Sequence, residues 1–223
     1  MGQWITLDTP HGPVAAWQAL PDGRPRAGLV VVQEIFGVNA HIRDVAERYA
    51  GQGYAVLAPA FFDPVERGVE LAYDPGDFAH GRDLVGRLGL DAAVDIARAA
   101  AARLQADHGV ARVGVVGYCW GGTVALLAAQ RLGLPAASYY GARNVPFLDE
   151  PLAAPVIFHF GEDDPSIPPD VVRLHREKLP AMAVHAYPAG HAFNRDVDAS
   201  AYHAPSAALA WERTLAFFAR ELA

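Results

Sequence analysis

The sequence predicts an α/β protein in which helices cover a mostly parallel central sheet. Short apolar runs of strand length alternate along the chain with longer stretches of helix length, which is typical of βαβ units. Several of the apolar runs are continuous, as expected of strands buried on both faces. No composition shift, flexible linker or repeat divides the 223 residues. We therefore expect residues 1–223 to form a single three-layer domain.

The predicted strands are rich in valine and aromatic residues and are bounded by glycine, proline or polar residues. The first two should pair as an antiparallel hairpin around His11-Gly12-Pro13. The later ones should form the parallel part of the sheet. The expected strands span residues 4–7, 14–20, 27–32, 54–58, 113–116, 136–140, 155–160 and 182–187.

The predicted helices lie between these strands, with Asn39 and Ser206 as expected caps of the first and last. They span residues 41–51, 91–105, 121–132, 170–179 and 206–222. The glycine- and proline-rich stretch 61–89 predicts a long loop with a short helix near 77–84. Loops of this length in compact domains usually cover or line a site.

The turn between strand 113–116 and helix 121–132 carries the first chemical signal. Its sequence, Gly117-Tyr-Cys-Trp-Gly121, is a G-x-C-x-G motif, the pattern of a nucleophile elbow with cysteine in place of serine. Glycines permit the sharp strand-to-helix turn, and the helix N-terminus favours a thiolate. Cys119 is the only cysteine, so it has no disulfide partner within the chain. It is a candidate nucleophile.

A cysteine nucleophile needs a base and an orienting acid, and both should follow strand ends, where α/β proteins place their sites. His191 follows the last strand and is the candidate base. We expect His159 to be a core residue and the remaining histidines to lie on the surface. Glu162, Asp163 and Asp164 share one turn after strand 155–160, and each could be the acid. Glu34 follows strand 27–32.

Composition narrows the class of function. With a formal net charge of −7 and no cluster of basic residues, the chain is not expected to bind nucleic acid. No apolar run reaches the roughly 18 residues of a membrane-spanning helix, and we expect no signal peptide before the first strand. A lone cysteine fits the cytoplasm. Neither a metal nor another cofactor is expected, and a monomer is the default expectation.

The chain resembles the dienelactone hydrolase (carboxymethylenebutenolidase) family of the α/β-hydrolase superfamily. The matching segments occur in the family's order, and Gln33-Glu-Ile-Phe-Gly-Val-Asn39 and Gly117-Tyr-Cys-Trp-Gly-Gly122 are the most specific. They are residues 33–40, 117–122, 139–141, 161–168 and 190–195, with a similar closing helix at 211–214. The resemblance implies Cys119 as nucleophile, His191 as base and Asp164, in preference to Asp163, as its partner.

The resemblance also implies further roles. Glu34 would help to take the thiol proton when substrate enters. The backbone N–H groups of Ile35 and Trp120 are the expected oxyanion donors. Arg195 would bind a substrate carboxylate, since an arginine can bind one bidentately. The long loop 61–89 aligns poorly with the family; within it, Tyr73 and Arg82 are the candidate substrate contacts, with Arg67 as an alternative to Arg82.

The expected function is cysteine-dependent hydrolysis of lactones or small esters through an acyl-thioester. Dienelactone and another small ester are open alternatives as substrate, because Ala192 and Trp120 depart from the residues usual in the family. A non-catalytic binding protein of the α/β-hydrolase fold is a second class. Carboxylesterase, acyltransferase or cysteine peptidase chemistry on an unrelated substrate is a third.

Overall fold

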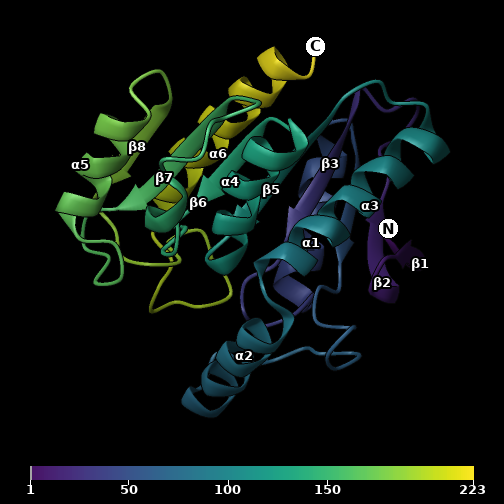
Figure 1. Ribbon diagram of the computed structural model, residues 1–223, viewed down its shortest axis with the longest axis horizontal. Helices are drawn as coiled ribbons and strands as arrows, with labels where there is room; N and C mark the ends of the chain where they lie inside the picture. The colour runs from purple at the N-terminus through teal and green to yellow at the C-terminus, as the bar shows by residue number, and fades with distance from the viewer. Residues whose placement is uncertain (1) are drawn as a thin grey trace. The chain divides into compact units, whose positions relative to one another are not determined.

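The computed structural model describes residues 2–223, which begin with three strands and then continue with strands separated by helices (Figure 1). The prediction of an α/β protein with a mostly parallel sheet is confirmed. The chain divides inside strand β5 (Val113–Tyr118) into two units. The first holds the residues up to Val115 together with Ala223, and the second holds Val116–Leu222.

The first unit is a sheet that begins with the predicted hairpin. Strands β1 (Gln3–Thr9) and β2 (Gly12–Ala19) pair antiparallel, with the buried residues Leu7 and Val14 opposite each other. Strand β2 pairs antiparallel with β4 (Tyr54–Pro59), and β4 pairs parallel with β3 (Ala27–Val32). Every residue of β3 and β4 is buried, as their continuous apolar sequences predict.

Three helices belong to the first unit, and two of them, α1 (Ala40–Gly51) and α3 (Leu90–His108), pack on β3 and β4. Asn39 caps α1 as predicted, because its side chain accepts a hydrogen bond from the Ile42 N–H at 3.3 Å. Gly109 ends α3 in the left-handed conformation that suits glycine.

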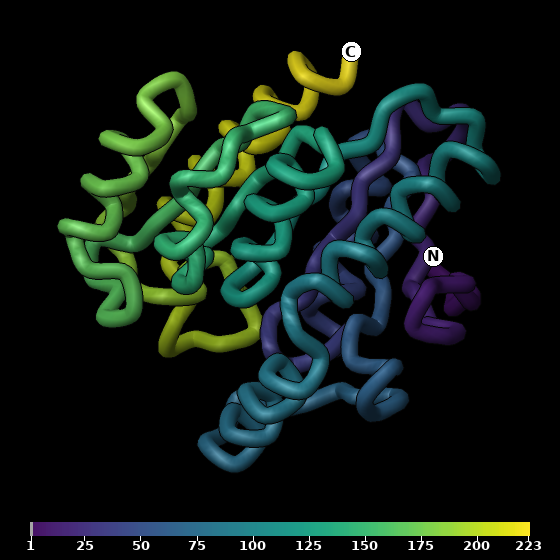
Figure 2. Tube along the Cα trace, in the orientation of Figure 1, coloured from purple at the N-terminus to yellow at the C-terminus, as the bar shows by residue number. Residues whose placement is uncertain are grey.

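The short helix predicted near 77–84 is present but longer: α2 spans Pro75–Leu88, so most of the second half of segment 61–89 is helical and not loop (Figure 2). Asp74 caps this helix and Pro75 occupies its first turn, so these two residues start a helix rather than a loop. Gly81 lies within it, at a place where a Cβ atom would stand 2.2 Å from the Ile35 carbonyl oxygen. This glycine therefore permits close packing and does not break the helix.

The second unit continues the sheet pattern with parallel strands. Beyond β5 come β6 (Ala136–Tyr139), β7 (Val156–Gly161) and β8 (Ala183–Tyr187), in that order. Helix α4 (Trp120–Leu132) packs on β6 and α6 (Ala204–Glu221) on β7, and Figure 1 shows them on opposite sides of these strands. Helix α5 (Pro169–Lys178) packs on β8 and on a short 3-10 helix, Val145–Phe147.

Three local predictions are wrong: the cap of the last helix and the surface positions of two histidines. Helix α6 begins at Ala204, ahead of Ser206, because Pro205 is allowed in a first turn; Ser206 hydrogen-bonds His203 instead of capping. His41 and His175, expected on the surface, are buried. His175 lies on the inner face of α5, where Asn144 and the Val171 carbonyl supply its hydrogen bonds. His159 is a buried core residue as predicted.

Candidate active site

Cys119 lies at the junction of β5 and α4 in a strained backbone conformation. Its φ is 55° and its ψ is −117°, and it occupies the N-cap position of α4. The Cys119 N–H donates to the Tyr139 carbonyl at 3.0 Å, which ties the turn to β6. A positive φ at a residue other than glycine is typical of functional sites where the surrounding fold enforces the geometry.

Glycines make this turn sterically possible. A Cβ atom at Gly117 would lie 1.8 Å from the Gly121 carbonyl oxygen, and one at Gly122 would lie 2.6 Å from the Tyr139 carbonyl oxygen. Strand and helix backbones therefore approach each other too closely for any side chain at these two positions. Gly117 is the first glycine of the G-x-C-x-G motif, and Gly122 directly follows the motif.

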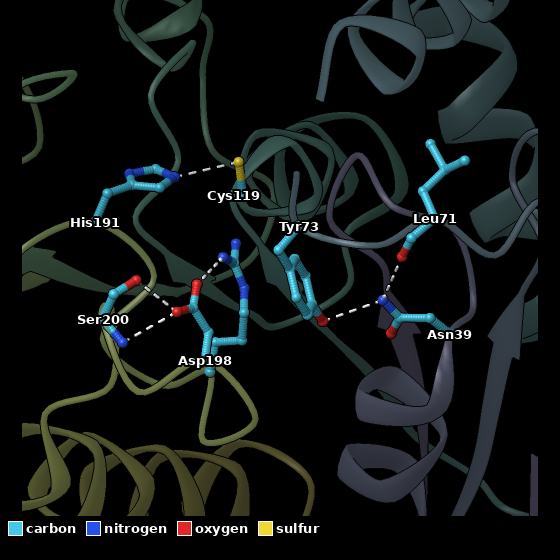
Figure 3. Close-up of polar contacts among 8 residues, drawn as sticks. Asn39, Leu71, Tyr73, Cys119, His191, Asp198 and Ser200 are labelled. Carbon is cyan, nitrogen blue, oxygen red and sulfur yellow. Dashed lines mark hydrogen bonds and ion pairs between the residues drawn. The ribbon is translucent and has the colours of Figure 1, made fainter. Parts of the chain in front are cut away.

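The side chains of Cys119, His191 and Asp164 form a connected array in the second unit. The His191 Nε2 atom lies 3.2 Å from the Cys119 Sγ atom, which Figure 3 shows as a dashed line. The other ring nitrogen, Nδ1, lies 2.6 Å from the Asp164 Oδ2 atom and donates its proton to that oxygen when Nδ1 is protonated. A histidine held between a thiol and a carboxylate is the geometry of an activated nucleophile.

Asp164, and not Asp163 or Glu162, is the carboxylate that contacts His191. Its side chain is fully buried, and its second oxygen, Oδ1, accepts the Ser166 N–H at 2.8 Å. Glu162 and Asp163 are exposed, and their backbone N–H groups bind the Tyr187 and Ala189 carbonyls. These two bonds fix the acidic turn beside the segment that leads to His191.

The His191 ring is a stronger base than an ordinary histidine. Burial lowers its pKa, but hydrogen bonds to Asp164 and Cys119 and the attraction of their charges outweigh burial and raise the pKa to about 10. An ordinary thiol has a pKa of about 8.5. A histidine of this basicity can therefore take and hold a thiol proton.

An aromatic ring, that of Tyr140, packs against the array in the second unit. Tyr140 packs against the His191 ring at 5.1 Å between ring centres and against Phe193 at 5.4 Å. Tyr140 and Ala192 both have positive φ values, 39° and 61°. In the sequence, Tyr140 stands out only as part of a segment that matches the family. No sequence pattern predicts its contact with His191.

Arg195 lies four residues after His191, and its side chain is 9% exposed. Its guanidinium donates to Asp198 Oδ2 at 3.0 Å. Ser200 donates to Asp198 Oδ1 from both its N–H and its hydroxyl (Figure 3). The hydrogen bond from the Ser200 hydroxyl, together with Arg195, lowers the pKa of Asp198. Sequence reasoning missed this partner of Arg195, although Asp198 is only three residues away.

The remaining predicted site residues lie in the first unit, except Trp120, which is buried at the start of α4. Glu34 and Ile35 are buried just after β3. The Tyr73 hydroxyl accepts a hydrogen bond from Asn39 at 3.1 Å (Figure 3). The Tyr73 ring packs edge-on against Phe36. Arg82 is exposed on α2. The structure thus brings together three of the predicted residues, Cys119, His191 and Asp164.

Two further properties concern the described residues, 2–223. Among them, no group of three or more histidine, cysteine, aspartate or glutamate side chains could hold a metal ion. None of the helices formed by these residues is both long enough and apolar enough to cross a membrane.

A mostly parallel α/β sheet with a strained cysteine at a strand-to-helix turn, followed by an acid and then a histidine, defines a hydrolase of the α/β-hydrolase superfamily. Within that superfamily the chain belongs to the dienelactone hydrolase family, whose model matches residues 14–222. The resemblance inferred from the sequence is confirmed, and so is the prediction of a carboxylic ester hydrolase of this type.

Individual relatives agree with this assignment. The carboxymethylenebutenolidase of Pseudomonas putida is 35% identical over 220 residues, which cover 89% of this chain and 88% of the relative. A crystal structure described as a dienelactone hydrolase of Klebsiella pneumoniae is 32% identical, with a TM-score of 0.84 and 98% of each chain covered. The Pyrococcus furiosus esterase Pf2001, 14% identical, shares the fold with a TM-score of 0.70 over 100% of this chain and 92% of its own.

Proposed function

We propose that the protein hydrolyses lactones or small esters with Cys119 as nucleophile, His191 as base and Asp164 as the group that orients His191. The observation that carries this proposal is the position of the His191 ring, 2.6 Å from Asp164 Oδ2 on one side and 3.2 Å from Cys119 Sγ on the other. The raised pKa of His191 supports the assignment of the base.

The first half of the reaction forms a thioester. His191 Nε2 takes the thiol proton, and the Cys119 sulfur attacks the carbonyl carbon to give a tetrahedral oxyanion. The carbon–oxygen bond of the ester then breaks, and His191 returns the proton to the departing oxygen. When the substrate is a lactone, this oxygen remains attached to the acyl group as an enol or alcohol.

The second half of the reaction releases the acid. His191 Nε2 takes a proton from a water molecule, whose oxygen attacks the thioester carbon. The carbon–sulfur bond breaks, and the proton passes from His191 to the Cys119 sulfur. Asp164 holds the His191 ring in place throughout and stabilises the imidazolium.

The other predicted roles are part of the same proposal and rest on the family resemblance of their segments. The backbone N–H groups of Ile35 and Trp120 stabilise the oxyanion, and Glu34 assists removal of the thiol proton. Arg195 binds a substrate carboxylate, and its burial beside Asp198 supports a fixed position for the guanidinium. Tyr73 and Arg82 are the proposed substrate contacts of the segment that follows β4.

The setting proposed for this activity is a cytoplasmic monomer, folded as one domain, which works on small molecules and needs no cofactor. Nucleic acid is not a proposed partner, in keeping with the formal net charge of −7. Sedimentation of the purified chain tests the monomer, since a dimer would double the mass.

The test of the substrate class is steady-state hydrolysis of a dienelactone beside an uncharged p-nitrophenyl ester. The parent should hydrolyse both, with the higher kcat/KM for the dienelactone because Arg195 can bind its carboxylate. Cys119→Ala should lose nearly all activity. Turnover of the uncharged ester alone would reject the carboxylate-bearing substrate. Activity retained by Cys119→Ala would reject the mechanism.

The acid can be tested with neighbouring carboxylates of the same turn. Asp164→Asn should lower kcat by a large factor, up to about 10⁴, since the amide can hold His191 in the wrong tautomer. Asp163→Asn is the matched control, because Asp163 is exposed and contacts the site only through its backbone. It should retain the parent rate. Equal losses in the two variants would show that Asp164 has no special role.

A further inference from the structure

We infer that Gly161 is a positioning residue: the absence of a side chain there sets the distance between Asp164 and His191. The inference rests on the proposed function and deepens it, because it names the feature that holds base and acid together. Gly161 ends β7, opposite Tyr187 of the neighbouring β8, and it precedes Asp164 by three residues.

The space beside Gly161 is occupied by the backbone that leads to His191. A Cβ atom at position 161 would lie 2.3 Å from the Ala189 carbonyl oxygen and 2.6 Å from the Gly190 carbonyl oxygen. The φ of Gly161 is not positive, so its conformation is open to any residue. Space alone, and not backbone strain, therefore demands glycine at this position.

The same carbonyl joins the two segments. The Ala189 oxygen accepts the Asp163 N–H at 3.0 Å, and the Tyr187 oxygen accepts the Glu162 N–H at 2.8 Å. Asp163 directly precedes Asp164, and Ala189 lies two residues before His191. A methyl group at Gly161 would push the Ala189 carbonyl away and break its hydrogen bond with the Asp163 N–H.

Such a displacement reaches the contact between Asp164 and His191. Their 2.6 Å hydrogen bond fixes the ring that also lies 3.2 Å from Cys119 Sγ, so a shift of either segment moves the base away from the nucleophile. Misplacement of a catalytic group by about 1 Å can cost about 100-fold in rate. We expect Gly161→Ala to lower kcat by about 10- to 100-fold, with KM little changed.

Gly190 provides a matched control. It directly precedes His191, and from the sequence it looks like the more critical glycine. A Cβ atom there would meet only the Asp163 carbonyl oxygen, at 3.9 Å, an ordinary contact. Its φ is not positive either. Gly190→Ala should therefore keep the parent kcat although it is closer in sequence to the base.

The experiment compares Gly161→Ala and Gly190→Ala with the parent in p-nitrophenyl ester hydrolysis and in proton NMR. The proton on His191 Nδ1, held by a buried carboxylate, should give a strongly downfield resonance in the parent and in Gly190→Ala. Gly161→Ala should lose or shift this resonance while circular dichroism shows a folded chain. A Gly161→Ala protein with the parent's resonance and kcat would overturn the inference.

A second pair of variants serves if Gly161→Ala does not fold. Asp163→Pro removes the N–H that binds Ala189, whereas Asp163→Ala keeps it, and both lack the exposed carboxylate. Only Asp163→Pro should lose kcat and the downfield resonance; equal behaviour would contradict the inference. Activity retained by Cys119→Ala would overturn the proposed function itself. An inactive Cys119→Ala beside a fully active Gly161→Ala would overturn only the role of Gly161.

Discussion

Cys119 stores strain in the backbone at the point where the reaction is proposed to start. Its φ of 55° is costly for a residue with a Cβ atom, by an amount of order 1–3 kcal/mol. The surrounding turn enforces this conformation through the Tyr139 carbonyl and the glycines at 117 and 122. The surrounding backbone therefore fixes the conformation of residue 119, whichever side chain this residue carries.

This strain can be measured with two inactive variants. Cys119→Ala keeps a Cβ atom and so keeps the strain, whereas Cys119→Gly removes it. The relief exceeds the extra entropy that glycine loses on folding, and Cys119→Gly should be more stable than Cys119→Ala by about 1 kcal/mol. Urea unfolding of both proteins gives the difference. A less stable Cys119→Gly would mean that the turn is not strained.

At the level of single residues, local sequence left the choice of acid open. Glu162, Asp163 and Asp164 are adjacent carboxylates, and only the fold turns one of them toward His191. The family resemblance selected Asp164, and Asp164 is the carboxylate that lies 2.6 Å from the His191 ring. The pairing of Asp198 with Arg195 was not predicted. An acidic residue in a loop has no distinguishing sequence pattern, and its role becomes visible only when the position of its partner is known.

Among the elements, those with continuous apolar sequences were predicted almost to the residue, and α2 was not. Strands β3, β4 and β5 are buried along their whole length. Their sequences are therefore continuously apolar, and this pattern predicts a strand. Helix α2 contains three glycines and begins with proline, which favour a loop when only local preference is weighed. The helix forms nevertheless, because Asp74 caps it and because Gly81 lets it pack closely against the Ile35 carbonyl.

The turn between β5 and α4 should tolerate no side chain at Gly117. Gly117→Ala would place a Cβ atom 1.8 Å from the Gly121 carbonyl, so we expect a loss of several kcal/mol or failure to fold. Gly86→Ala on α2 is the control. A Cβ atom there meets nothing within 4 Å, and alanine should stabilise the helix by about 0.5–1 kcal/mol. Thermal unfolding of both variants measures these changes in stability. A Gly117→Ala protein as stable as the parent would contradict the prediction.

For the molecule as a whole, the ionisation of His191 links stability to pH. Its pKa in the folded protein, about 10, exceeds the roughly 6.5 of an unfolded histidine, so folding favours the protonated ring. The resulting stabilisation is fully present below about pH 6.5 and is lost as pH rises toward 10.

The corresponding measurement is the free energy of unfolding in urea at pH 6, 8 and 10 for the parent and His191→Gln. The parent should be the more stable protein at pH 6, and its advantage should shrink toward pH 10. An advantage that grows with pH would show that His191 is not held protonated by Asp164 and Cys119.

A chain with one cysteine has no internal means of repairing that cysteine after oxidation. The first product of peroxide on a thiolate is a sulfenic acid, which a second cysteine nearby can trap as a reducible disulfide. Cys119 has no such neighbour in the sequence. Peroxide should therefore inactivate the protein and, without added thiol, carry the residue on to the irreversible sulfinic acid. Mass spectrometry should find a gain of two oxygen atoms at Cys119, and early addition of glutathione should preserve activity.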